Sequence, residues 1–176
     1  MKLVTYTRGG AAPRAGLLVG NDLETVLDLE RVVGAPWAKT VLGFVEHARE
    51  GRPSAEKAIA THDRAAAVPA KEVTLLAPIP RPPSMRDGYA FRQHVETARK
   101  NRGLEMIPEF DQFPVFYFTN HQAVVGPGAV RVKPKTLERL DFELECAIVV
   151  GRECADLTAA NADEAIFGLT IMNDFS

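Results

Sequence analysis

The segment 141–150 (DFELECAIVV) carries three acidic side chains at alternate positions. Alternate side chains of a strand share one face, so Asp141, Glu143 and Glu145 line one side. Like charges about 7 Å apart on one face repel each other, and a cation between them removes that repulsion. Carboxylate oxygens are the ligands that Mg²⁺ and Ca²⁺ prefer. The pattern therefore fits either a divalent-cation site or a solvated edge strand whose acids discourage pairing with other chains.

A second group of reactive side chains stands in the segment 85–94 (MRDGYAFRQH). We expect a helix over roughly Tyr89–Arg102, ended by Gly103. Asp87 is expected to cap this helix, and His94 to lie two turns further along the same face. An imidazole can serve as a general base, but a lone helical histidine is more often a surface or core residue. The spacing alone leaves both roles open.

The first 77 residues have the pattern of a small α+β domain. Short apolar runs predict three strands, at 2–7, 15–20 and 23–29. Apolar residues then recur with a helical period from Trp37 to Ala48, and Gly51 is expected to end this helix, with Pro53 just beyond. Four prolines in 77–84 (APIPRPPS) favour an extended linker. We therefore expect two domains, at 1–77 and 78–176.

The rest of the chain reads as strand-rich. Strands are expected at 114–119, 122–125, 129–132, 141–150 and 169–173, and a short helix at 159–167. Cys146, on the apolar face of the strand 141–150, is expected to be a small core residue. An apolar run leads directly to Asp174-Phe175-Ser176 without a polar tail. This ending fits a native terminal strand or, more readily, a fragment of a longer protein.

Composition narrows the class of protein. The 176 residues hold 21 Lys+Arg and 23 Asp+Glu, a net charge of −2, and 46% hydrophobic residues. This near-neutral balance gives no electrostatic footprint for nucleic acid or an anionic membrane, and no apolar run reaches the ~20 residues of a membrane span. Two cysteines make no disulfide framework, which favours a cytoplasmic location. There is no Walker A loop, nucleophile elbow or zinc-binding cysteine pattern.

Three runs of residues resemble the fumarylacetoacetate hydrolase family. They are DGYAFRQH from Asp87, DFELE from Asp141 with the following AIVVG, and FGLTIMNDFS ending at Ser176. The resemblance covers about residue 78 to the end, whereas the first 77 residues match only loosely, as a variable N-terminal domain. It implies an α+β fold, a mixed β-roll catalytic domain of which this chain holds the first half, and a homodimer.

The resemblance also implies the site. Metal ligands would be Glu143 and Glu145 of the E-x-E strand, Asp174 of the M-N-D motif and Asp87, holding Mg²⁺, or else Ca²⁺ or Mn²⁺. His94 falls on the histidine that activates water. Tyr89 and Tyr117 resemble tyrosines that contact the substrate. The chain departs from one subfamily pattern at Thr97, where that pattern has a glutamate that orients the histidine.

The resemblance implies a metal-dependent hydrolase that cleaves a C–C bond in a β-diketo acid of the acylpyruvate or fumarylacetoacetate type, so the expected partner is a small keto acid. Decarboxylation of an oxo acid, isomerisation, or hydration of a dienoic acid on the same fold is one alternative. A non-catalytic, cation-stabilised binding module is the other, and the presence of His94 argues against it.

Overall fold

The computed structural model describes residues 1–61 and 64–176. They divide into two compact units, residues 1–79 with 126–176 and residues 80–125. Within the described residues, no helix is both long and apolar enough to pass through a membrane.

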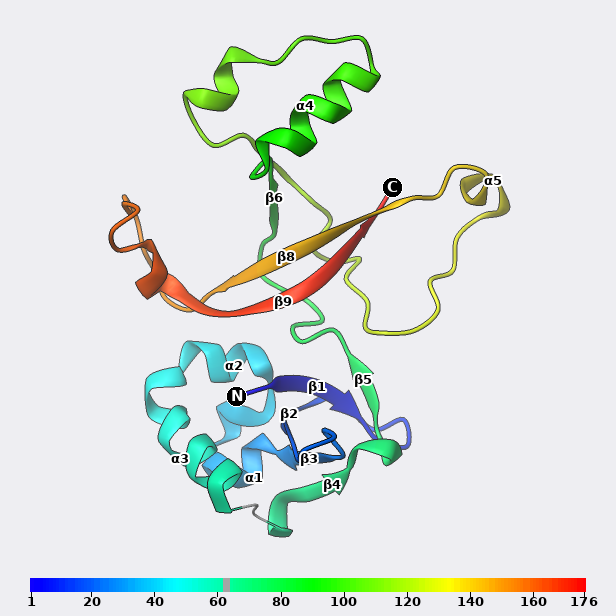
Figure 1. The fold of residues 1–176 in the computed structure, drawn as a ribbon. Helices are drawn as coiled ribbons and strands as arrows, with labels where there is room; N and C mark the ends of the chain where they lie inside the picture. Colours follow the sequence, from blue (N-terminus) through cyan, green and yellow to red (C-terminus); the bar gives the residue numbers. More distant parts are fainter. Residues whose placement is uncertain (62–63) are drawn as a thin grey trace. The chain divides into compact units, whose positions relative to one another are not determined.

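A five-stranded antiparallel sheet organises the first part of the larger unit (Figure 1). Its strands lie in the order β4-β3-β2-β1-β5. Their bounds are β1 Leu3–Thr7, β2 Arg14–Val19, β3 Thr25–Asp28, β4 Ala67–Pro69 and β5 Thr74–Leu76. Leu17 of β2 pairs with Leu3 on one side and Leu27 on the other. The three predicted N-terminal strands are therefore confirmed.

Helices cover this sheet and close its core. They are α1 Leu29–Val33, η1 Pro36–Lys39, α2 Val41–Glu46 and α3 Ala48–Thr61, followed by the single turns η2 Arg64–Ala66 and η3 Ala70–Glu72. Leu17, Leu29 and Phe44 are fully buried between sheet and helices. Burial of such side chains is the main force that holds the layers together.

The prediction that Gly51 ends a single helix is wrong. The helical segment is instead interrupted at Thr40 and at His47, and α3 continues through both Gly51 and Pro53. A Cβ at Gly51 would come within 2.6 Å of the Phe44 ring and 3.0 Å of the Trp37 ring. The glycine is there because the helix backbone approaches these rings closely.

A long antiparallel ribbon belongs to the same unit (Figure 1). It consists of β8 Phe142–Val150 and β9 Ile166–Phe175, which pair along their whole length. The short helix α5 Pro134–Leu137 precedes it, and the turn η5 Ala162–Ala165 leads into β9. Strand 141–150 is confirmed. The short helix expected at 159–167 is confirmed only in its middle, as the 3₁₀ turn η5, because β9 already begins at Ile166.

The base of the ribbon packs on the N-terminal core. Phe167 and Val149 lie against the buried cluster beneath the sheet. The Phe167 ring meets Phe44 edge-on, with 6.3 Å between ring centroids, and the Arg52 guanidinium lies 5.1 Å from the same ring centroid. These contacts fix β9, and with it the ribbon, to helices α2 and α3.

One face of the ribbon is apolar and exposed. Its large side chains are 44–78% exposed, and they are Phe142, Leu144, Ile148, Val150, Leu169, Ile171 and Phe175. Cys146 lies on the same face and is also exposed, so the prediction that it is a core residue is wrong. The alternation was correct, but nothing among the described residues covers this face.

The smaller unit is built from a two-stranded sheet and one main helix. Strands β6 Arg86–Gly88 and β7 Phe116–Phe118 pair antiparallel, and α4 Arg92–Asn101 and η4 Pro108–Asp111 lie between them in sequence. Gly103 follows α4 with a φ of 71°, a conformation that glycine adopts without strain. The predicted end of this helix is confirmed.

Two expectations for the segment 80–133 are wrong. Asp87 does not cap α4, because it lies in β6 and the helix begins five residues later, after Phe91. The described residues 119–133 contain no strand, so those expected at 122–125 and 129–132 are absent. Gly126 instead lies so close to β5 that a Cβ would come within 2.6 Å of Leu76 Cα.

Candidate metal centre

The acidic side chains of the ribbon share one face. Glu143 of β8 is the direct partner of Asp174 of β9, and Glu145 lies two residues along β8. Direct partners and residues two apart point to the same side of an antiparallel pair. Backbone hydrogen bonds between Asp141 and Ser176, at 2.8 and 3.1 Å, extend the pairing to the end of the ribbon. Two distant segments thus place their carboxylates together.

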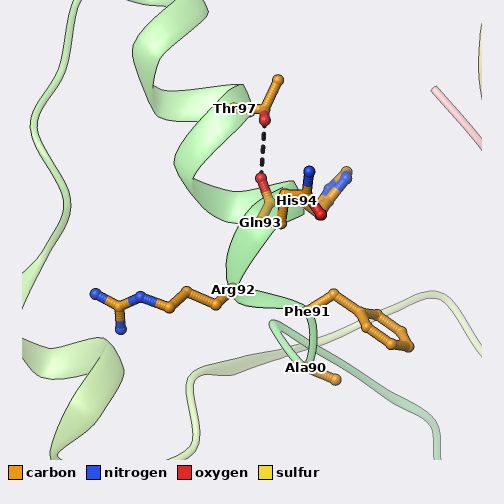
Figure 2. A pocket seen from close by; sticks show the side chains of 6 residues that line it. All are labelled: Ala90, Phe91, Arg92, Gln93, His94 and Thr97. Atoms are coloured by element: carbon orange, nitrogen blue, oxygen red, sulfur yellow. Dashed lines mark hydrogen bonds between the residues drawn. The ribbon is translucent and has the colours of Figure 1, made fainter.

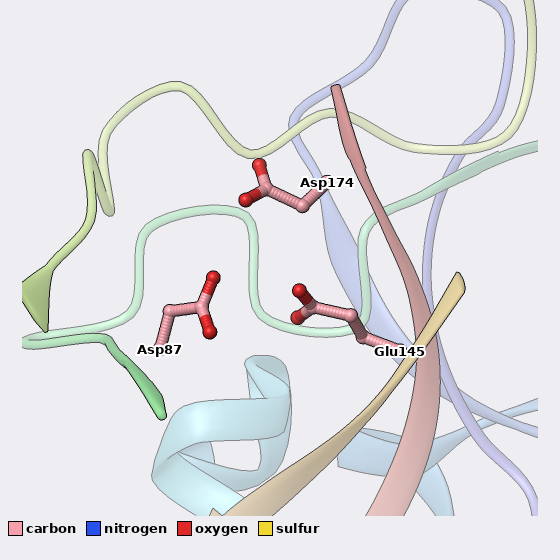
Figure 3. A group of neighbouring side chains, drawn as sticks. All are labelled: Asp87, Glu145 and Asp174. Carbon is pink, nitrogen blue, oxygen red and sulfur yellow. The ribbon is translucent and has the colours of Figure 1, made fainter. Parts of the chain in front are cut away.

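Glu145 and Asp174 bring carboxylate oxygens near each other. One carboxylate oxygen of each lies within 4.8 Å of the other, and both side chains are half-buried, whereas Glu143 is exposed. Figure 3 draws these two side chains, and also Asp87 of β6. A divalent cation takes oxygen ligands at about 2.0–2.6 Å, so one ion can touch two oxygens this far apart. The donor set is made of hard oxygens and fits Mg²⁺, Ca²⁺ or Mn²⁺.

Asp87 is held by a partner strand in the smaller unit. It pairs with Tyr117 in the β6–β7 register, and the Tyr117 hydroxyl donates a hydrogen bond to Asp87 Oδ2 at 2.6 Å. Thirty residues separate the two in sequence. No local pattern predicts the pairing, and the sequence reasoning missed this contact. The other predicted tyrosine, Tyr89, follows β6 directly and is 43% exposed.

His94 lies in the first turn of α4 and lines an open pocket of about 640 Å³ (Figure 2). The other lining residues are Ala90, Phe91, Arg92, Gln93 and Thr97. The Thr97 hydroxyl donates to the Gln93 carbonyl at 2.8 Å, a bond within the helix. Thr97 therefore does not take over the orienting role that a glutamate has in the subfamily pattern. Phe91, 76% exposed, is the aromatic residue among those that line this pocket.

Two ion pairs and a ring contact brace this helix. Arg92 pairs with Glu96 one turn along, at 2.8 Å, and with Asp111 of η4, at 2.5 Å. Its guanidinium also lies 5.4 Å from the Phe110 ring centroid. These exposed contacts hold η4 against the start of α4, where His94 stands. Each exposed ion pair contributes little to stability on its own, and the two share the Arg92 guanidinium.

Comparison with known protein families matches the part of the chain that holds the predicted site residues. The profile described as fumarylacetoacetate (FAA) hydrolase C-terminal matches residues 84–176, more than half of the chain. The matched region contains every residue predicted for the site.

Known proteins are similar to this chain over part of their length. Protein Rv2993c of Mycobacterium tuberculosis is 34% identical over 108 residues, which cover 61% of this chain and 38% of the relative. The mitochondrial oxaloacetate tautomerase FAHD2A of Bos taurus is 28% identical over 167 residues, covering 94% of this chain and 49% of the relative. The chain therefore spans no more than about half the length of either relative.

A solved structure shares the fold. The maleylpyruvate hydrolase from Sphingobium sp. SYK-6, in complex with manganese(II) and pyruvate, superposes with a TM-score of 0.67 at 21% identity. The match covers 99% of this chain and 58% of that chain. The likeness confirms the predicted α+β fold class.

Proposed function

Because this chain belongs to the fumarylacetoacetate hydrolase family, we propose that it contributes the carboxylates and the base of a divalent-cation-dependent enzyme that hydrolyses a C–C bond in a β-diketo acid. The observation that carries the proposal is the pairing of Glu143 with Asp174, with Glu145 beside them on the same face. An acid on the opposing strand adds repulsion to a structural edge strand, whereas it adds a ligand to a cation site.

In the proposed site, the cation is held by Glu143, Glu145, Asp174 and Asp87. Four carboxylates suit Mg²⁺, Ca²⁺ or Mn²⁺ better than soft-ligand metals. When bound, such an ion supplies Lewis-acid polarisation of a substrate carbonyl and neutralises negative charge on oxygen. Manganese in the maleylpyruvate hydrolase structure is in keeping with this donor set.

His94 is proposed as the general base. An imidazole nitrogen takes a proton from water while the water oxygen attacks a carbonyl carbon of the substrate. The adjacent C–C bond then breaks, and its electron pair stays on the leaving fragment as an enolate, which a proton converts to the ketone. The open pocket beside the imidazole gives room for substrate and water. Tyr89 and Tyr117 are proposed to contact the keto acid.

Tautomerisation of an oxo acid is the second candidate reaction. It is favoured by the similarity to an oxaloacetate tautomerase along 94% of this chain. That reaction also passes through an enolate, so the same carboxylates and base serve it. The two reactions differ in their products, because only hydrolysis breaks a C–C bond.

Product analysis tests the proposal. The chain is incubated with Mn²⁺ and either acetylpyruvate or oxaloacetate, and products are followed by chromatography and by the enol absorbance. Hydrolysis predicts acetate and pyruvate from acetylpyruvate, abolished by a chelator. Enol–keto exchange of oxaloacetate without C–C cleavage supports the tautomerase instead. Absence of both reactions in the full-length protein, in a preparation that binds Mn²⁺, supports a binding module. Homodimeric assembly and a cytoplasmic location remain predictions, which light scattering and fractionation can check.

A further inference from the structure

Tyr117 and Asp87 form the polar contact of the β6–β7 sheet. They are direct partners in the antiparallel register, so their side chains stand on the same face. The Tyr117 hydroxyl lies 2.6 Å from Asp87 Oδ2. This is the short distance expected when a hydroxyl donates to an ionised carboxylate.

We propose that Tyr117 is a positioning residue, which fixes the Asp87 carboxyl group so that its other oxygen can bind the cation. The inference rests on the proposed function, since it takes Asp87 as a ligand. It adds a role for Tyr117 other than substrate contact. The hydrogen bond between Tyr117 and Asp87 lies within the unit 80–125, so it is formed before any cation or substrate binds.

The chemistry of a carboxylate explains why such a partner matters. The terminal torsion of an aspartate is broad, so an unrestrained carboxyl group samples many orientations. The Tyr117 bond occupies Oδ2. With one oxygen held in this way, the carboxyl group has fewer orientations to sample when its other oxygen binds a cation. Partners of this kind are usually worth about 10–100-fold in metal affinity.

The sheet that carries both residues is itself held in place. The Arg86 guanidinium lies 4.5 Å from the Phe118 ring centroid, across the pair that neighbours Asp87 and Tyr117. The Tyr89 N–H donates to the Val115 carbonyl at 3.0 Å and so extends the pairing beyond β6. The register that sets Tyr117 opposite Asp87 therefore has support on both sides.

Calorimetric titration with Mn²⁺ tests the inference. Tyr117→Phe removes only the hydroxyl, and Thr119→Val is the matched control, because it removes a hydroxyl just after β7 without changing side-chain size. We expect Tyr117→Phe to raise the Mn²⁺ Kd about 10–100-fold and Thr119→Val to leave it unchanged. The thermal midpoint without Mn²⁺ should be the same in both variants and wild type, since Tyr117 is 47% exposed and its ring is retained.

A double-mutant cycle shows whether Tyr117 acts through Asp87. In an Asp87→Ala background, Tyr117→Phe is expected to have no further effect on the Mn²⁺ Kd. An unchanged Kd in Tyr117→Phe alone, or an equal loss with and without Asp87, would overturn the positioning role and leave the proposed function intact. Failure of the wild-type chain to bind Mn²⁺ would overturn both.

Discussion

Glu143 and Asp174 stand directly opposite each other across the β8–β9 ribbon, although 31 positions separate them in sequence. Antiparallel pairing puts their side chains on one face, together with Glu145. Acidic residues opposite each other destabilise a sheet unless something offsets their repulsion. A bound cation does so, and the predictions for this site follow from that relationship.

Glu145→Gln should weaken cation binding. The substitution keeps the side-chain size and removes one charge from the pair whose oxygens lie within 4.8 Å. Because affinity for hard cations follows the ligand charge count, we expect the Mn²⁺ Kd to rise roughly tenfold or more. Glu153→Gln, an exposed acid in the loop after β8, is the control with the same charge change. Equal affinities in the two variants would place the cation elsewhere.

His94→Ala should separate chemistry from cation binding. Loss of a general base is expected to lower kcat by roughly 10²–10⁴-fold, with the Mn²⁺ Kd nearly unchanged. His121→Ala, in the same unit, serves as the control. If His94→Ala keeps most of the turnover, another group activates the water.

The exposed face of the ribbon should bind a hydrophobic dye. Leu144 and Ile171 are 73% and 78% exposed in an apolar surface that includes five other large side chains. Contiguous apolar surface of this kind promotes association. Leu144→Thr with Ile171→Thr keeps the strand propensity and should lower both dye fluorescence and self-association of the 176-residue chain. Val130→Thr, an exposed valine outside the ribbon, should change neither.

Local sequence patterns predict the strands, but they do not predict which residues pair between strands that are distant in sequence. The alternation in 141–150 identifies a strand and its acidic face from neighbouring residues alone. The partner of Asp87 lies 30 residues away, so the segment around it looked like the start of a helix. The pairing of Glu143 with Asp174 depends on the register of two strands, which no single segment determines.

Glycine and cysteine were misread for the same reason. Gly51 looked like a helix end, but its role depends on the Phe44 and Trp37 rings that a Cβ would meet. Cys146 was placed correctly on an apolar face, yet burial depends on what covers that face rather than on alternation. For the site residues, motifs identified candidates, and the structure added the geometry of the ribbon and the Tyr117 contact.

Asp28 should make the stability of the N-terminal sheet depend on acid pH. Its buried carboxylate accepts hydrogen bonds from Tyr6, from Arg14 and from the Arg31 backbone. Burial opposes ionisation of Asp28, but the hydrogen bonds outweigh it and lower the pKa of this carboxyl group. Burial and the hydrogen bond to Asp28 raise the pKa of Tyr6 to about 12. The stabilisation is therefore complete above the unfolded-state pKa of about 3.9 and is lost as pH falls through the lower folded-state pKa.

Asp28→Asn should lower the free energy of unfolding at pH 7 by about 3 kcal/mol and remove this acid dependence, as measured by urea unfolding at several pH values. The exposed Asp22→Asn should leave both unchanged, and an Asp28→Asn curve parallel to wild type between pH 5 and about pH 2 would contradict the assignment.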